Sequence, residues 1–179
     1  MMPSETKFSV MLFSLFSLVM TCFLTTSCGY QVGSMMHPQI QSIAVADVKN
    51  DTKEPYASSV MRGNLAEQFQ VDGSLKLTSL GKADCIVYCR VLRVETSAIR
   101  WDSQDDDQTY RPSEFAINVT VEFTVLIPGR SEPLIRTRQI TGSANYQYTA
   151  DPNVGKIYGL RQACYNAARR IVQYTTEAW

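Results

Sequence analysis

The feature that most limits how this chain can fold is a strict alternation of apolar and polar residues over Glu114–Ile127. Every second residue from Phe115 to Ile127 is apolar. In a β-strand, alternate side chains point to opposite faces. The segment is therefore predicted to be a long strand with one buried and one polar face, as in an antiparallel sheet covered on one side only.

Three other segments are predicted to be strands of the same sheet. They are Ile40–Val48, Cys85–Ala98 and Leu134–Tyr148. The third returns from a turn at Pro128-Gly129, because proline and glycine interrupt regular structure. The residues between the second and the central strand, Ile99–Ser113, are predicted to form a polar connection.

A first helix is predicted over Glu54–Val71. Its apolar residues lie three and four positions apart and form one stripe: Tyr56, Val60, Met61, Leu65 and Phe69. The turn Lys49–Lys53 precedes it, Asp51 or Thr52 is expected to cap it, and Asp72-Gly73 is expected to end it.

A second helix is predicted to begin at the end of the chain's last strand. Asp151 is expected to cap it and Pro152 to occupy its first position. Small residues in its apolar stripe should allow a close approach to the sheet. The stripe consists of Ile157, Leu160, Arg161, Cys164, Ala167, Ala168 and Ile171.

The order of elements is β-α-β-β-β-α, with Leu75–Leu80 as an extra short strand or an extended link. It predicts an α+β fold in which two helices pack on one face of a mainly antiparallel four-stranded sheet. The other face should be open and polar along Asn118, Thr120, Glu122 and Thr124. This face is a candidate contact surface, and the alternative is a solvated face without a partner.

The N-terminal segment has the pattern of a lipoprotein signal peptide. Lys7 precedes the apolar run Phe8–Leu24, and small residues lead to Cys28. We expect residues 1–27 to be removed, Cys28 to be acylated, 28–39 to form a lipidated tether and 40–179 to form one domain. Two alternatives are an uncleaved membrane anchor and acylation of Cys22.

Gly29 follows the proposed lipidated residue, where an aspartate would favour retention in the inner membrane. The outer membrane, with the domain on its periplasmic face, is therefore the expected location. Two or more acyl chains suffice for stable attachment.

Charge is balanced, with 17 basic and 17 acidic side chains, so nucleic-acid binding is not expected and any charged contact must come from a local patch. No nucleophile, phosphate-binding loop or cofactor motif is evident, and a non-enzymatic protein without a cofactor is predicted. The acidic run Asp102–Asp107 lacks the spacing of a calcium loop and is expected to be a solvated hairpin tip beside Trp101 and Tyr110.

Three cysteines follow Cys28. Cys85 and Cys89 stand about 13 Å apart if they lie on one strand, which is too far for a disulfide. Both are expected to pack as small apolar residues. Cys164 on the last helix could pair with either of them in an oxidising periplasm, which leaves one thiol free.

Several segments together resemble the lipopolysaccharide-assembly lipoprotein LptE family. They are Cys28-Gly29-Tyr30, the stretch Ile40–Ala57 with Asn50, Thr52, Glu54 and Pro55, then Ala83-Asp84, Gly142-Ser143-Ala144 and a C-terminal helix closing on Trp179. The resemblance covers essentially the whole mature chain. The chain departs from the family at Ala46-Asp47-Val48, where a proline and an aromatic residue are expected.

The resemblance implies a 1:1 complex with the β-barrel LptD, in which the lipoprotein plugs and helps to assemble the barrel, and the pair inserts lipopolysaccharide into the outer leaflet. The lumen of a large barrel is polar, so the polar strand face is the expected barrel-facing surface. A rival class is a periplasm-facing regulator or secretion-channel lipoprotein, such as a cell-wall synthase activator or a curli-type component.

Arginines on two strands are candidates for contact with lipopolysaccharide phosphates, because guanidinium groups bind phosphate bidentately. They are Arg90, Arg93, Arg136 and Arg138. The alternative is ordinary surface charge.

Overall fold

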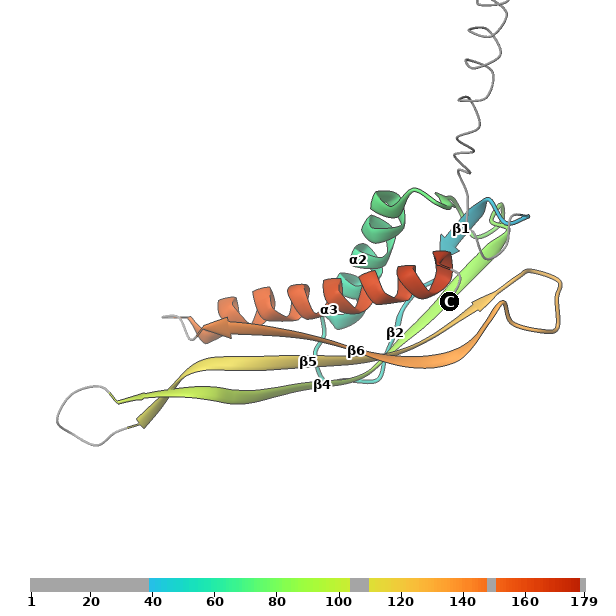
Figure 1. Ribbon diagram of the computed structural model, residues 1–179. Coiled ribbons are helices and arrows are strands. Elements are labelled where there is room, and N and C mark those ends of the chain that lie inside the picture. The colour runs from blue at the N-terminus through green and yellow to red at the C-terminus, as the bar shows by residue number, and fades with distance from the viewer. Residues whose placement is uncertain (1–38, 104–109, 148–150, 178–179) are drawn as a thin grey trace, which may run out of the picture. The chain divides into compact units, whose positions relative to one another are not determined.

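The computed structural model describes residues 39–103, 110–147 and 151–177 (Figure 1). The predicted signal peptide, Cys28 and all of the predicted tether except Gln39 lie outside these residues. The same is true of Asp105–Asp107 in the acidic run and of Trp179. No helix among the described residues combines the length and the apolar character needed to cross a bilayer.

Within the described residues the sheet contains six strands, so the expected number of four is wrong, although the α+β class is confirmed. Three long strands are antiparallel: β4 (Cys85–Ser103), β5 (Tyr110–Leu126) and β6 (Ile135–Gln147). Three short strands pair in parallel: β1 (Ser42–Val45), β2 (Lys49–Asn50) and β3 (Lys76–Leu77). The order is β3-β1-β4-β5-β6, and β2 pairs with β4.

The parallel pairs follow from the connection between β1 and β4. The helix α2 (Ala57–Asp72) lies between them in the chain, and a helical crossover brings the next strand back in the same direction. The predicted strand Ile40–Val48 is shorter in the structure, where β1 covers Ser42–Val45. The strand β2 (Lys49–Asn50) falls in the predicted turn Lys49–Lys53, so part of that turn belongs to the sheet.

The hairpin of β4 and β5 is longer than expected. The sequence predicts Ile99–Ser113 as a polar connection, but β4 continues to Ser103 and β5 resumes at Tyr110. Trp101 pairs with Pro112 and Asp102 with Arg111 in this outer part. Two register shifts near Arg100 break the alternation, so the sequence there has no period of two even though the strands remain paired.

The two helices begin differently. Asp151 caps α3 (Pro152–Thr176) as predicted, because its side chain accepts a hydrogen bond from the Asn153 N–H at 2.9 Å. The expected cap of α2 by Asp51 or Thr52 is wrong. That helix begins three residues later than predicted, after Tyr56, without a side-chain cap. Gly73, with φ 70°, ends α2 as expected.

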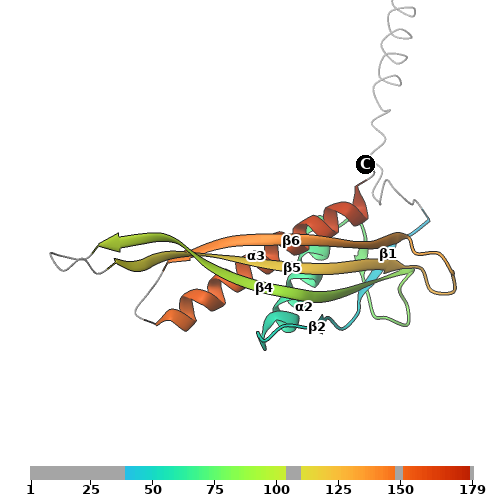
Figure 2. The same cartoon turned by 90° about the horizontal axis from the view of Figure 1, so that it is seen from below.

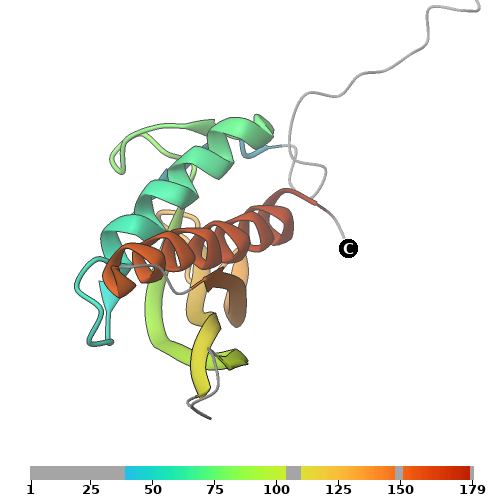
Figure 3. The same cartoon turned by 90° about the vertical axis from the view of Figure 1, so that its left-hand side faces the viewer.

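Both helices lie on the same side of the sheet, as expected (Figure 3). The core between them and the sheet is apolar. Its largest fully buried side chains include Met61, Leu65 and Phe69 of α2, Val87 and Val91 of β4, Ile117, Val119, Val121, Phe123 and Val125 of β5, and Ile171 of α3. The alternation in β5 thus places its apolar residues in the core. In α3, the predicted stripe members Ile157 and Arg161 are exposed instead.

The helix α3 approaches the sheet very closely at Gly142 of β6. A Cβ atom on this residue would lie 2.1 Å from the carbonyl oxygen of Ala163 and 2.6 Å from the backbone nitrogen of Ala167. The predicted close packing of the last helix is confirmed, and it requires a glycine on the strand as well as alanines on the helix.

Candidate functional site: the open face of the sheet

The face of the sheet opposite the helices is polar and lies toward the viewer in Figure 2. Asn118, Thr120, Glu122 and Thr124 form a half-buried row along its central strand. The strand register places polar partners on both sides of this row. We call this surface the open face: Tyr88, Arg90, Arg93 and Glu95 of β4, the four residues of β5, and Gln139, Thr141 and Ser143 of β6.

Two hydrogen bonds connect the row with β6. The hydroxyls of Thr120 and Thr141 lie 3.1 Å apart, and the Thr124 hydroxyl donates to the Ile135 carbonyl at 2.9 Å. The strand face predicted from sequence as a contact surface is therefore a continuous polar surface three strands wide. Other hydrogen-bonding groups can dock on it without a loss of apolar burial.

A bulge in β4 brings Arg90 and Arg93 onto the same face. A regular strand would place residues three apart on opposite faces. Here the register shifts between Val91 and Arg93, so Arg90 pairs with Glu122 and Arg93 with Thr120. The alternation of residues in the sequence could not have shown that Arg90 and Arg93 are neighbours.

Each of these arginines already has an acidic neighbour. A guanidinium nitrogen of Arg90 lies 3.5 Å from an Asp51 carboxylate oxygen, and one of Arg93 lies 3.4 Å from Glu95. All four side chains are at least 44% exposed, and ion pairs of this kind contribute about 0–1 kcal/mol. A phosphate group could therefore replace either carboxylate at small cost.

The arginines of β6 are placed elsewhere. Arg138 pairs with the buried Phe123 and so lies on the helix face, where its guanidinium carbon is 5.3 Å from the centre of the Tyr174 ring. Arg136 is exposed, within a second register shift. The four arginines proposed from sequence are thus not one cluster: the bulge in β4 places Arg90 and Arg93 together on the open face, while Arg138 lies on the helix face.

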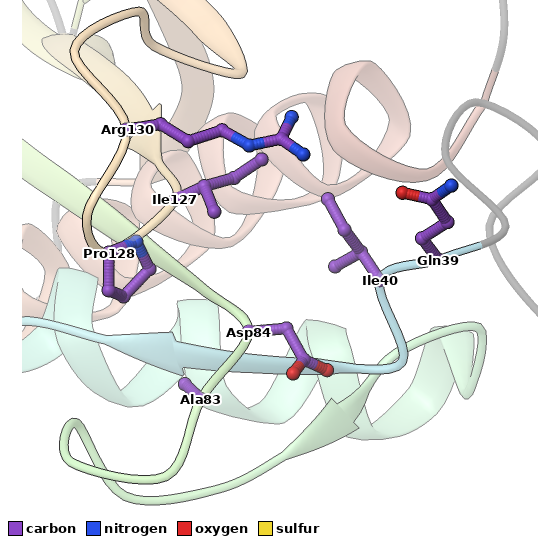
Figure 4. Close-up of a pocket in the computed structure, with 7 residues that line it drawn as sticks. All are labelled: Gln39, Ile40, Ala83, Asp84, Ile127, Pro128 and Arg130. Atoms are coloured by element: carbon purple, nitrogen blue, oxygen red, sulfur yellow. The ribbon is translucent and has the colours of Figure 1, made fainter.

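Hollows adjoin the described part of the sheet on the open face and near Gln39. One of about 150 Å³ on the open face is lined by side chains of both charges, among them Asp47, Lys49, Arg90 and Glu122. A larger one of about 560 Å³ lies where the chain enters the domain, with Asp84 and Arg130 on opposite sides and Ile40 and Ile127 between them (Figure 4).

Asp84 holds the first strand in place. One of its carboxylate oxygens accepts hydrogen bonds from the Ser42 hydroxyl at 2.7 Å and from the N–H groups of Ser42 at 2.9 Å and Gln41 at 3.1 Å. These bonds, that of the Ser42 hydroxyl foremost, lower the pKa of the Asp84 carboxyl. The Ala83-Asp84 pair noted in the sequence therefore has a structural role in joining β1 to β4.

The turn before α2 is also explained by its contacts. The Asn50 side-chain oxygen accepts from the Thr52 N–H and hydroxyl, and its amide donates to the Glu54 carbonyl. The Glu54 carboxylate pairs with Lys156 of α3. Asn50, Thr52 and Glu54 thus fix the turn and connect it to the other helix, a link between distant residues that sequence reasoning missed.

The three cysteines after Cys28 are buried free thiols. Burial raises the pKa of Cys85, Cys89 and Cys164 to about 12. Their expected packing as small apolar residues is confirmed. The disulfide considered between Cys164 and either strand cysteine is not present. Within the described residues, no group of acidic, histidine and cysteine side chains is arranged to hold a metal ion.

Exposed aromatic and aliphatic residues lie on the outer part of the hairpin. Trp101 is 55% exposed and Ile99 47% exposed. Trp101 pairs with Pro112 beyond the register shift that follows the pair Arg100–Glu114, so the alternation that defines the polar row of β5 does not extend to it. The side chain of Tyr110, which the sequence placed beside it, is outside the described part of the structure.

Solved structures with a similar fold share little sequence with this chain. A protein from Xanthomonas campestris is 13% identical, with a TM-score of 0.52 over 76% of this chain and 84% of that one. The PelC dodecamer from Paraburkholderia phytofirmans is 13% identical, with a TM-score of 0.47 over 82% of this chain and 95% of that one. Rare lipoprotein B from Shewanella oneidensis is 15% identical, with a TM-score of 0.40 over 74% of this chain and 92% of that one. The first of these supports the fold and nothing further.

The comparison with family models identifies the family of this chain, which the structural likenesses do not. No curated protein matches the chain. The model of the LptE family, described as lipopolysaccharide-assembly, matches residues 40–175. That range begins before β1 and ends in the last turn of α3, so it includes the whole sheet with its open face. This chain is a member of the LptE family.

Proposed function

We propose that the protein is an outer-membrane lipoprotein of the lipopolysaccharide translocon, anchored by acyl chains on Cys28 and facing the periplasm. It forms a 1:1 complex with an LptD β-barrel, plugs and helps to assemble that barrel, and supports the insertion of lipopolysaccharide into the outer leaflet. The role is structural and not enzymatic. Intact mass of the membrane-extracted chain tests the acylation, because an unmodified Cys28 would contradict it.

The observation that carries this proposal is the open face. The lumen of an outer-membrane barrel is polar, so a plug must offer hydrogen-bonding groups to it. The open face does so across three strands, with hydroxyl, amide and charged side chains. Its length also suits a plug. The 19 residues of β4 extend about 60 Å, which exceeds the height of about 25 Å of the apolar band of an outer-membrane barrel.

Arg90 and Arg93 are the arginines best placed to meet lipopolysaccharide. They share the open face, and each pairs with an exposed carboxylate. A double substitution to Glu should lower the amount of lipopolysaccharide that co-purifies with the chain, while Arg62→Glu on α2 serves as a charge-reversal control. Equal retention by the double variant would contradict the contact.

The barrel-facing role is tested by Thr120→Arg. The new side chain stands in the middle of the open face, where it can reach solvent without disturbing the core, so the isolated chain should fold. Co-purification with the co-expressed barrel should fall at least tenfold. Glu67→Arg, an exposed position on α2, is the control. An unchanged yield of complex with Thr120→Arg would show that another surface contacts the barrel.

A further inference from the structure

The strand β6 forms a long outer edge of the sheet. It has 13 residues and stands last in the strand order, as Figure 2 shows. The carbonyls of Thr141 and Ser143 are bound by α3 side chains: Arg170 donates to the first at 3.1 Å and Asn166 to the second at 2.9 Å. Both donors come from outside the β5–β6 ladder, so these carbonyls point away from β5.

The N–H groups of the same two residues point away from β5 as well. In an antiparallel strand the N–H and C=O of one residue lie on the same side. The edge therefore alternates outward-facing donors and acceptors, which is the pattern that an added strand needs. The outward-facing carbonyls of Thr141 and Ser143 are bound by the flexible side chains of Arg170 and Asn166, and an arriving strand can displace these side chains.

The layer formed by β6 and α3 is strongly basic. Its residues include Arg136 and Arg138 on the strand and Lys156, Arg161, Arg169 and Arg170 on the helix, and neither element contains an acidic residue. These six positive charges stand out in a chain whose total charge is zero. Lys156 pairs with Glu54, and both Arg138 and Arg170 lie along the edge.

A groove runs beside this edge. It measures about 620 Å³ and lies between β6 and the second half of α3. Its lining consists of Gln139, Ile140, Thr141, Arg170, Gln173 and Tyr174. Side chains from one face of an added strand would enter this groove, where Arg170 is the charged group that they meet.

We propose that the outer edge of β6 accepts an extended segment of another protein as an additional β-strand, and that this segment carries carboxylate side chains. The incoming N–H groups replace Arg170 and Asn166 on the two carbonyls. Arg170 is then free to bind a carboxylate of the segment, a charge-assisted contact that is stronger than its bond to a neutral carbonyl. This edge adjoins the open face that we assign to the barrel at Thr141 and Ser143, but the added strand uses their backbone groups and the side chains of α3 instead of the side chains of β5.

A second copy of this chain is a poorer occupant. Pairing two β6 edges would bring Arg138 and Arg170 of one copy close to the same two residues of the other. Like charges facing each other across strands are destabilising. An acidic segment gains attraction from the same residues, so charge favours a different partner over self-association.

The proposal is tested with the full chain and two synthetic eleven-residue peptides. One alternates Glu with Thr and Val, and the other carries Lys in place of Glu. Fluorescence anisotropy should show at least tenfold tighter binding of the Glu peptide. Amide exchange should slow at Thr141 and Ser143 when this peptide is present. Equal affinity for both peptides, or unchanged exchange at β6, would overturn the proposal.

Two pairs of variants separate backbone pairing from charge. Ser143→Pro removes an outward N–H at an edge position, where proline is tolerated, while Ser143→Ala keeps it. Arg170→Glu reverses the charge at the edge, while the neighbouring Arg169→Glu makes the same change of net charge. Ser143→Pro and Arg170→Glu should each weaken binding of the Glu peptide at least tenfold, and the controls less than threefold.

Other outcomes would exclude this mode of binding. If Ser143→Pro binds the Glu peptide as tightly as Ser143→Ala does, while salt or anionic lipopolysaccharide vesicles displace the peptide, charge alone holds it and no strand is added. Concentration-dependent dimerisation that Ser143→Pro abolishes would assign the edge to a second copy. The assay contains no barrel, so its result is independent of the proposed plug function.

Discussion

At the scale of single residues, Gly142 decides whether α3 can lie on the sheet. A methyl group there would overlap backbone atoms of Ala163 and Ala167, which cannot rotate away. Gly142→Ala should therefore lower the free energy of unfolding by more than about 2 kcal/mol, at the upper end of the cost of overpacking. Urea unfolding followed by circular dichroism measures the change.

Gly63 provides the matched control for this substitution. It lies within α2, is exposed, and a Cβ atom added to it would have no atom within 4 Å. Gly63→Ala should raise the free energy of unfolding by about 0.5–1 kcal/mol, since alanine favours the helix. If both substitutions had the same effect, the close contact at Gly142 would not be rigid.

At the scale of elements, the regular parts could be predicted from sequence and the irregular parts could not. The alternation in β5 identified the central strand and its buried face, because period two is repeated without interruption. The bulges near Leu92 and Arg100 left no comparable signal. Predicting that Arg90 and Arg93 share a face, or that β4 continues beyond Ala98, required the pairing with β5.

The short parallel strands show a second limit. Lys49–Asn50 and Lys76–Leu77 are each two residues long, too short for any period to be read. Their pairing depends on where α2 places the chain, which is a tertiary effect. The capping of the two helices also differs. Asp151 caps α3 by a bond to the N–H group two residues later, whereas Thr52, an expected cap of α2, is hydrogen-bonded to Asn50 within the preceding turn.

The bulge in β4 makes a prediction about deletions. Leu92 is the extra residue between the pairs Val91–Val121 and Arg93–Thr120. Its removal should leave every later pair and face unchanged and cost less than about 2 kcal/mol, within the range of ordinary single changes. Arg90 and Arg93 should then still share the open face.

Deletion of Val94 is the contrasting case. It lies in a regular part of the strand, so its loss would exchange the buried and open faces for the rest of β4 or force a new register. This variant should fail to give a cooperative unfolding transition, while the Leu92 deletion retains one. Cooperative unfolding of both, measured in urea, would contradict the assigned bulge.

At the scale of the whole molecule, the chain separates two surfaces with different chemistry. The open face is polar and contains charges of both signs, while the layer of β6 and α3 contains only positive ones. The remaining residues therefore carry 11 basic and 17 acidic side chains, since 6 of the 17 basic residues belong to that layer. A neutral total thus hides a basic edge that can select an acidic partner.

These two surfaces should act independently. Thr120 contacts the hydroxyl of Thr141 and Arg170 its carbonyl, and substitutions that act on independent groups are usually additive within about 0.3–0.5 kcal/mol. Thr120→Arg should therefore reduce barrel co-purification and leave the affinity for the Glu peptide within about twofold, and Arg170→Glu should do the reverse. The double variant should lose both activities by the sum of the single effects. A loss of both activities in either single variant would mean that barrel and strand compete for one surface, because Thr120 and Arg170 both adjoin Thr141 of β6.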